Sequence, residues 1–162
     1  MSTDRVPDPS GAPAPVVVSI HVAKARRLPM RAVGSVEVEA GKGLIGDRYH
    51  GSRRRHVTVQ SLEELAEATA RAGPGEGPGI DPARTRRNLT LSAGRLPRTP
   101  GHRFRIGPIE LEVVRDAAPC KLLDDAIGRA ARLALARRAG VVCRVLSDGV
   151  LRVGDAALLE VE

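Results

Sequence analysis

Short alternating segments that end at glycine turns fill the second half of this sequence. The segments RFRI (103–106) and IELEVV (109–114) are separated only by Gly107-Pro108, which is typical of two strands joined by a tight turn. Three further strand-like segments follow, VVCRVL, VLRV and AALLEV, separated by SDG and GD. Strands joined by turns this short pair in antiparallel fashion. The pattern therefore predicts a mainly β chain that forms an antiparallel barrel rather than a doubly wound parallel sheet.

The first half predicts further strands and the first of two helices. Alternation predicts strands in PVVVSIHVA (15–23), GSVEVEA (34–40) and RRNLTLS (86–92). A helix is expected from Gln60 to Gly73, because Ser61 and Glu64 have the spacing of a capping box. The glycine-rich segment PGEGPGIDP (74–82) is expected to be a loop, and a second helix is expected over 121–140. Strands thus outnumber helices in this reading.

The segment EAGKGLIGDRYHG (39–51) has the glycine spacing of a dinucleotide-binding loop, at Gly41, Gly43 and Gly46. That loop works only when a helix opens directly after it, because the helix N-terminus receives the pyrophosphate. Here the following residues have no helical apolar period, and HVTVQ (56–60) alternates like a strand. The sequence therefore excludes NAD binding at this loop and leaves the glycines to be explained otherwise.

Composition is that of a globular protein, and the positive charge is compatible with an anionic partner such as phosphate, a phosphorylated cofactor or nucleic acid, without establishing one. The chain has 162 residues, 42% of them hydrophobic, and a formal net charge of +7. This length suits one domain over 16–162, preceded by a proline-rich tail over 1–15 that cannot bury apolar surface. The two cysteines are too few for a disulfide framework, and no apolar run approaches the length of a membrane span. We expect a soluble cytoplasmic protein.

Cys120 is the first candidate for chemistry. It follows a predicted strand and Pro119, and precedes Lys121 at the start of the second predicted helix. A helix N-terminus and a neighbouring cation favour the thiolate, which attacks electrophiles and binds soft metals. The alternative is a small buried residue in a strand-to-helix turn. Cys143 lies within an alternating strand and is expected to serve packing.

Other catalytic patterns are weak or missing. The four histidines have no helical i, i+4 pair and no Cys-x-x-Cys partner, which argues against a structural zinc site. No G-x-S-x-G motif is present. Lys121 alone is weak support for a pyridoxal phosphate Schiff base.

Several polar residues lie at loop and strand edges rather than on helix faces. Asp47-Arg48 follows Gly46, and Arg86-Arg87-Asn88 precedes a predicted strand. Arginine forks suit phosphate, and an asparagine amide can both donate to and accept from the edge of a heterocycle. The alternative for each arginine is a solvated surface charge.

Six motifs in order, GLIGDRYHG, RHVTVQSLEEL, RRNLTL, IGPIELEV, APCKLLDD and AGVVCRVLSDGVLRVGD, resemble the MOSC family, named for the C-terminal domain of molybdenum cofactor sulfurase. The likeness runs from about Val16 to Glu160. It implies an antiparallel β-barrel similar to the barrel domain of pyruvate kinase, with about two or three helices. It also implies the molybdenum cofactor, with Cys120 as sulfur carrier or molybdenum ligand.

The cofactor is a pterin with a dithiolene and a phosphate, so its pocket needs a soft sulfur, cationic groups and amide partners. On the resemblance, Cys120 supplies the sulfur, and the cofactor-binding residues are Gly46, Asp47, Arg48, Arg86 and Asn88. The glycines would let the backbone approach the ligand, and Asp47 would support Arg48 or the loop.

The resemblance leaves the activity open. The chain could relay sulfur to a metal centre, or reduce N-hydroxylated compounds with separate electron-transfer proteins. Pyridoxal phosphate would enter only through a partner cysteine desulfurase, because the sequence contains no desulfurase domain. The rival interpretation is a non-catalytic basic β-barrel that binds nucleic acid, although the chain has only Tyr49 and Phe104 on which bases could stack.

Overall fold

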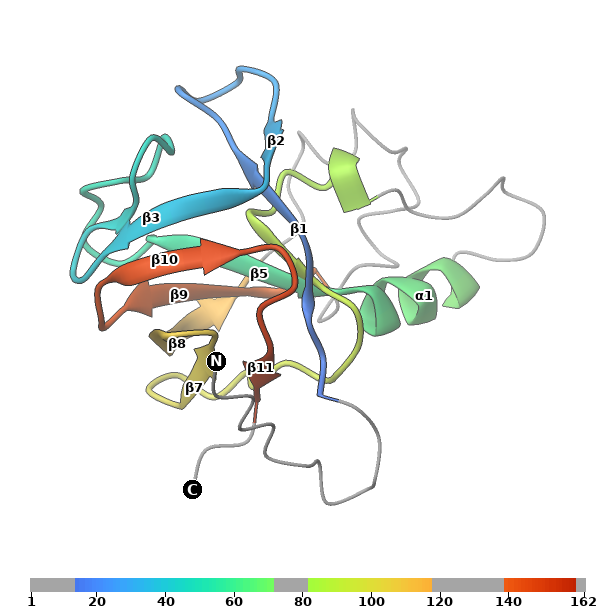
Figure 1. The fold of residues 1–162 in the computed structure, drawn as a ribbon. Coiled ribbons are helices and arrows are strands. Elements are labelled where there is room, and N and C mark those ends of the chain that lie inside the picture. The colour runs from blue at the N-terminus through green and yellow to red at the C-terminus, as the bar shows by residue number, and fades with distance from the viewer. Residues whose placement is uncertain (1–13, 72–81, 118–138, 160–162) are drawn as a thin grey trace.

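The computed structural model describes residues 14–71, 82–117 and 139–159. Most of the expected tail, most of the loop over 74–82, Gly73, Cys120, Lys121 and most of the second predicted helix lie outside these ranges. Within them the chain is mainly β, as the sequence predicted (Figure 1). The strands are β1 Val17–Val22, β2 Arg31–Val33, β3 Ser35–Glu39, β4 Gly43–Leu44, β5 Val57–Ser61, β6 Leu89–Leu91, β7 Arg103–Ile106, β8 Ile109–Asp116, β9 Val141–Val145, β10 Gly149–Arg152 and β11 Ala157–Leu158.

The strands form two sheets. The larger has the order β11-β7-β8-β9-β5-β6-β1-β2, and the smaller has the order β10-β3-β4. Among the described strand pairs only β5 and β6 run parallel, which confirms the mainly antiparallel prediction. The chain crosses from β5 to β6 through α1 Leu62–Arg71 and a short 3₁₀ turn at Pro82–Arg84.

The large sheet curls until its β11 edge meets the start of β1. Val16 bridges Ala156, Ala157 N–H donates to Pro15 O at 2.8 Å, and Val17 N–H donates to Asp155 O at 2.9 Å. These bonds satisfy backbone groups that an open sheet edge would leave unpaired. The sheet therefore closes into a barrel, and β2 projects beyond the closure as an edge strand.

The barrel core is aliphatic apart from Phe104 and Cys143. Period-two burial is clearest in β7, where Phe104 and Ile106 are buried while Arg103 and Arg105 are exposed. Side chains from the small sheet enter the same core, which shows that the β10-β3-β4 sheet packs against the barrel. They are Val36, Val38, Leu44 and Leu151.

Several local predictions needed correction. The glycine-rich segment 39–51 was expected to be a loop, yet its Gly43–Leu44 pairs with β3 as β4. A short turn joins β9 to β10, but the two do not pair with each other, because β10 crosses to β3.

β2 was not expected, because RAV is too short to alternate visibly and is specified by its pairing with β1. The capping box at α1 is also only half formed. Glu64 N–H reaches Ser61 Oγ at 3.5 Å, but the Glu64 carboxylate turns away and accepts Leu96 N–H at 3.1 Å. Ser61 still belongs to β5, paired with Leu91, so the expected reciprocal bond is replaced by a tertiary one.

Candidate cofactor-binding site

The polar residues singled out in the sequence gather at one end of the barrel. Pairing places the end of β1 beside the start of β6, through Ile20 and Leu89, and the end of β8 beside the start of β9, through Asp116 and Val141. β5 joins the two halves, because Val59 pairs with both Leu89 and Val141. We call this end of the barrel, with its loops at Ala23, 47–49, 86–88, Ala117 and 139–140, the site end.

Asp47 anchors the glycine loop to the site end. Its buried carboxylate accepts Ala23 N–H at 3.1 Å, next to the end of β1, and Tyr49 N–H at 3.3 Å. The same carboxylate lies 3.2 Å from Arg48 Nη1. Asp47 therefore supports both Arg48 and the loop that follows Gly46, as the sequence suggested.

Arg48 is turned inward. Its side chain is only 4% exposed, and besides Asp47 it meets Met30 Sδ at 3.3 Å and Arg86 O at 3.3 Å. Arg86 has a φ of +62°, a conformation that is strained for a residue with a Cβ. The guanidinium of Arg48 thus holds the carbonyl of Arg86 in place and stabilises that backbone conformation.

Asn88 ties three strands together. Its Oδ1 accepts the backbone N–H of Thr58 at 3.0 Å and the hydroxyl of Thr58 at 3.1 Å, and its Nδ2 donates to His21 O at 3.0 Å. The residue is 1% exposed. The amide oxygen therefore bonds to β5 and the amide nitrogen bonds to β1. Asn88 thus holds these strands in position within the chain.

Arg87 connects the segment before β6 to the start of β9. Its side chain is buried, and Nε donates to Ala139 O at 2.9 Å. Next to this contact, Ala117 N–H donates to Gly140 O at 2.9 Å. This bond holds together the residues that lie immediately before and after the segment 118–138. Cys120, three residues beyond Ala117, lies outside the described residues.

The glycine loop has a structural explanation at Gly43. This residue has a φ of +116°, and a Cβ there would lie 2.9 Å from His56 O. The space that a side chain would occupy is taken by the backbone of His56. The expectation that the glycines admit a ligand is therefore wrong for Gly43. Gly46, with a φ of +93°, has no described atom within 4 Å of a Cβ position.

His56 is buried with both ring nitrogens engaged. Nδ1 accepts Val145 N–H at 2.9 Å, and Nε2 donates to Ser52 O at 2.7 Å. Burial lowers the pKa of His56, and the charges of Arg144 and His50 lower it further, against the opposing bond to Ser52. The neutral tautomer with the proton on Nε2 is the form that fits these contacts.

This environment predicts a loss of stability in acid. An unfolded chain protonates histidine below about pH 6.5, whereas the folded chain resists protonation at His56, so the free energy of unfolding falls as the pH drops through that value. His56→Asn keeps an acceptor near Nδ1 but cannot titrate. The fall in melting temperature from about pH 7.5 to about pH 5.5 should be smaller in the variant than in the wild type. An equal fall in both proteins would rule out His56 as the titrating group.

Cys143 is fully buried in β9. Burial raises the pKa of its thiol, which disfavours the reactive thiolate. The prediction that Cys143 serves packing is confirmed.

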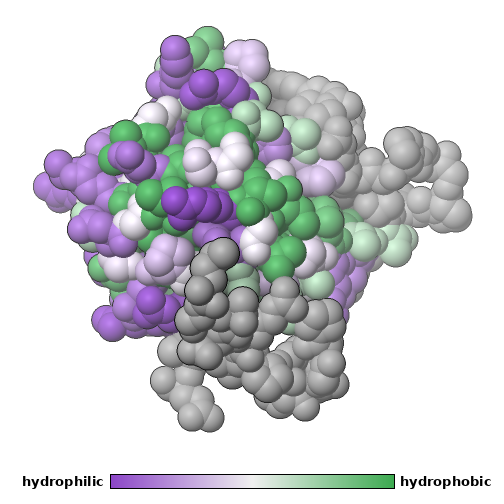
Figure 2. Space-filling view, viewed as in Figure 1, coloured by the Kyte–Doolittle hydropathy of each residue, from purple (hydrophilic) through white to green (hydrophobic). Residues whose placement is uncertain are grey.

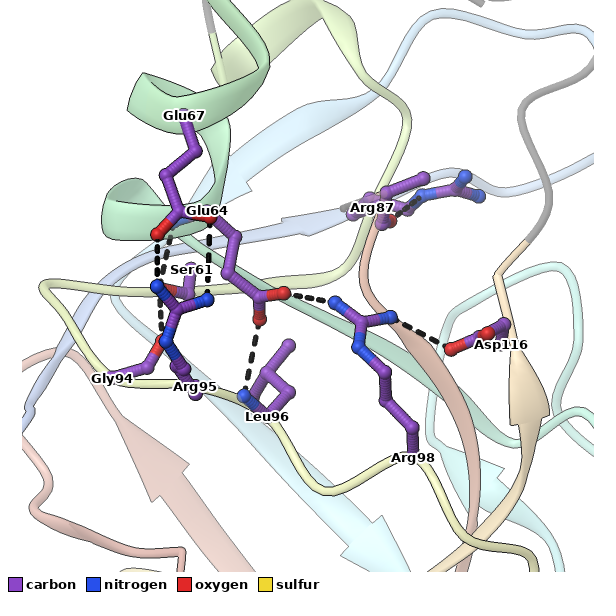
Figure 3. A network of polar contacts seen from close by, with 10 residues as sticks. Ser61, Glu64, Glu67, Arg87, Gly94, Arg95, Leu96, Arg98 and Asp116 are labelled. Atoms are coloured by element: carbon purple, nitrogen blue, oxygen red, sulfur yellow. Dashed lines mark hydrogen bonds and ion pairs between the residues drawn. The ribbon is translucent and has the colours of Figure 1, made fainter. Parts of the chain in front are cut away.

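An ion-pair network braces the site end from the side of α1 (Figure 3). Arg98 pairs with the buried carboxylate of Glu64 on α1 and lies 2.7 Å from Asp116 at the end of β8. Arg95 pairs with Glu67 one turn along the same helix, but its side chain is 68% exposed. Both arginines thus pair with a glutamate of α1, but the Arg98–Glu64 pair is far more buried than the Arg95–Glu67 pair.

That contrast yields a matched pair of variants. Arg98→Met should lower the free energy of unfolding by about 2 kcal/mol or more, because it leaves the buried Glu64 carboxylate without its cation. Arg95→Met should change it by less than about 1 kcal/mol, as is usual for exposed pairs. Urea unfolding measures both. Equal losses would mean that burial of Glu64 does not govern the network.

Among the described residues, no group of three or more His, Cys, Asp or Glu side chains is arranged to hold a metal ion. Within the same ranges, no helix has the length and apolar character needed to cross a membrane.

Comparisons with known proteins identify the family. The model of the MOSC domain matches residues 46–157, more than half of the chain. The YuaD protein from Bacillus subtilis has a similar fold, with a TM-score of 0.74 at 18% identity over 89% of this chain and 94% of that one. YiiM from Geobacillus stearothermophilus gives a TM-score of 0.63 at 19% identity, over 91% of this chain and 75% of that one.

YiiM from Escherichia coli has a TM-score of 0.63 at 17% identity, over 91% of this chain and 70% of that one. No curated protein matches the chain significantly in sequence. The likeness to the solved structures shows the fold, and the match to the family model begins at Gly46 and covers Asp47, Arg48 and the segment before β6. The chain therefore belongs to the MOSC domain family.

Proposed function

We propose that this chain binds the molybdenum cofactor at the site end of the barrel. The observation that carries the proposal is the convergence of three polar segments there. Arg48 bonds to Arg86 O, Arg87 bonds to Ala139 O, and Ala117 bonds to Gly140 O. These contacts join the glycine loop, the segment before β6, and the described residues on either side of Cys120, which are Ala117 and residues 139–140.

The donor set fits the cofactor in chemical type. Arg86 is partly exposed, and its guanidinium suits the phosphate of the cofactor. Arg48 acts through the carbonyl of Arg86, and Asn88 acts by fixing the start of β6, so both are positioning residues. Gly46 and Asp47 set the loop that carries Arg48.

Cys120 supplies the soft sulfur in this proposal. It follows Ala117, a residue of the site end, by three positions in the sequence. When bound, the cofactor would supply a molybdenum centre able to exchange electrons and sulfur ligands. The Cys120 thiolate would bind that centre as a ligand or would carry sulfur to it.

The two activities differ in what the partner delivers. In sulfur transfer, Cys120 thiolate attacks the terminal sulfur of a partner desulfurase persulfide, giving a Cys120 persulfide and releasing the partner's thiolate. In reduction of an N-hydroxylated compound, two electrons from a separate electron-transfer protein and two protons convert N–OH to N–H and water. A sulfane-sulfur assay of Cys120 after incubation with a cysteine desulfurase and cysteine separates the two activities.

The rival interpretation, a nucleic-acid-binding barrel, finds little support among the aromatic residues. Phe104 is fully buried. The guanidinium groups of Arg48 and Arg55 lie 4.6 and 4.3 Å from the centre of the Tyr49 ring. A ring already stacked by two arginines is a poor platform for a base.

The phosphate contact is tested by a matched pair of arginines. Arg86→Ala should weaken binding of the isolated cofactor to the apo-protein by roughly ten- to hundredfold, since a charge-assisted hydrogen bond is worth about 1.5–3 kcal/mol. Arg53→Ala removes the same charge from an exposed loop position and should have little effect. If both variants lost the same affinity for the cofactor, and the loss disappeared at high salt, the effect would come from net charge and not from a specific phosphate contact of Arg86.

A further inference from the structure

The connection between β1 and β2 is strongly and uniformly basic. Lys24, Arg26, Arg27 and Arg31 are all exposed, and the sequence has no acidic residue from 23 to 36. None of the four forms an ion pair with a described residue. Figure 2 shows hydrophilic side chains over this connection, at the top of the view. We call residues 24–31 the basic hairpin loop.

Two further features mark this loop as more than a solvated turn. Arg27 has a φ of +69°, a conformation that costs free energy at a residue with a Cβ. Beside it, Leu28 leaves 47% of its surface exposed. Cations without an ion-pair partner among the described residues, around an exposed leucine, match the usual composition of an interface, in which an apolar contact is surrounded by charges that select the partner.

The basic hairpin loop is also in contact with the candidate site. Met30 Sδ lies 3.3 Å from Arg48 Nη1, and the same guanidinium bonds to Arg86 O. A protein that docks on the loop would therefore lie next to Arg86. This is where a donor of electrons or sulfur would have to approach under the proposed function.

We propose that the basic hairpin loop is the docking site for an acidic protein, the donor of electrons or sulfur to this chain. Three of its four cations are arginines, whose planar forks pair with carboxylates in bidentate fashion. The identity of the donor rests on the proposed function, whereas the contact itself does not require the cofactor. Docking can therefore be measured on apo-protein, and its failure is distinguishable from failure to bind the cofactor.

The test uses a fluorescein-labelled oligoglutamate peptide as a defined acidic probe. Lys24→Glu/Arg26→Glu changes the loop without touching the left-handed Arg27. Arg105→Glu/Arg152→Glu makes the same change in net charge at exposed positions of β7 and β10. Fluorescence anisotropy should give a dissociation constant weakened by roughly tenfold or more in the loop variant, and by less than about threefold in the control. Thermal unfolding of both variants checks that each is folded.

Two outcomes would overturn the proposal. Equal weakening in the two variants would mean that net charge alone attracts the probe. A loop-dependent preference for single-stranded oligothymidylate, or for phosphatidylglycerol vesicles, over oligoglutamate would assign the loop to nucleic acid or to a membrane instead. In neither case would the loop be a docking site for an acidic protein.

Discussion

Asn88→Ala should lower the free energy of unfolding by about 3 kcal/mol or more, because each buried polar group left without a partner costs about 1–3 kcal/mol. The substitution removes the acceptor of Thr58 N–H and of Thr58 Oγ1, and the donor to His21 O. These groups are buried, since Asn88 and Thr58 are each 1% exposed and His21 is 9% exposed. Urea unfolding followed by circular dichroism measures the loss.

A double-mutant cycle isolates the Asn88–Thr58 contact. Thr58→Val removes the hydroxyl that donates to Asn88 Oδ1 and accepts from the backbone N–H of Asn88. In that background Asn88→Ala should cost less than in the wild type, with a coupling energy of about 1 kcal/mol or more. Strictly additive losses would mean that Asn88 stabilises the barrel independently of Thr58.

Cys120→Ser should abolish stable molybdenum retention or persulfide loading while leaving the barrel folded. A hydroxyl is hard and weakly acidic, whereas a thiolate is soft and is the form that binds metals and attacks sulfur. Metal analysis and sulfane-sulfur assay of the purified variant provide the readout, and its melting temperature should match that of the wild type.

Cys143→Ser is the control for that experiment. Cys143 is buried in β9 with a thiol pKa raised by burial, so the variant should lose stability and keep whatever cofactor the wild type holds. Burying a hydroxyl among apolar side chains costs about 1–3 kcal/mol. If the two variants lost cofactor equally, Cys120 could not be the specific sulfur ligand.

Local pattern was sufficient for most of the fold. β7 and β8 are separated only by Gly107-Pro108 and pair with each other, so their identity and pairing follow from neighbouring residues. β8 and β9 also pair, but residues 117–140 separate them in the sequence, and β10 pairs with β3 rather than with β9. The start of α1 was also close, because Ser61 caps the helix. β2 was missed, because a three-residue strand is defined by its partner β1 and not by its own pattern.

The roles within the candidate site depend on contacts that no local pattern contains. Asn88 bonds to Thr58 thirty residues earlier and to His21 sixty-seven residues earlier, so its position-holding role follows only from the barrel topology. Arg48 was predicted either to bind the cofactor or to be a solvated surface charge, yet its inward turn depends on Met30 and Arg86. Gly43 likewise could be explained only once His56 lay against it.

Whether the site end binds the molybdenum cofactor is decided by the metal and pterin content of wild-type protein purified from a host that makes the cofactor. We predict near-stoichiometric molybdenum, measured by mass spectrometry of the metal, together with pterin fluorescence after oxidation, both lost in Cys120→Ser. Protein from the same host that carried neither molybdenum nor pterin, and that instead bound single-stranded nucleic acid in a salt-sensitive manner, would show that the site end does not bind the cofactor.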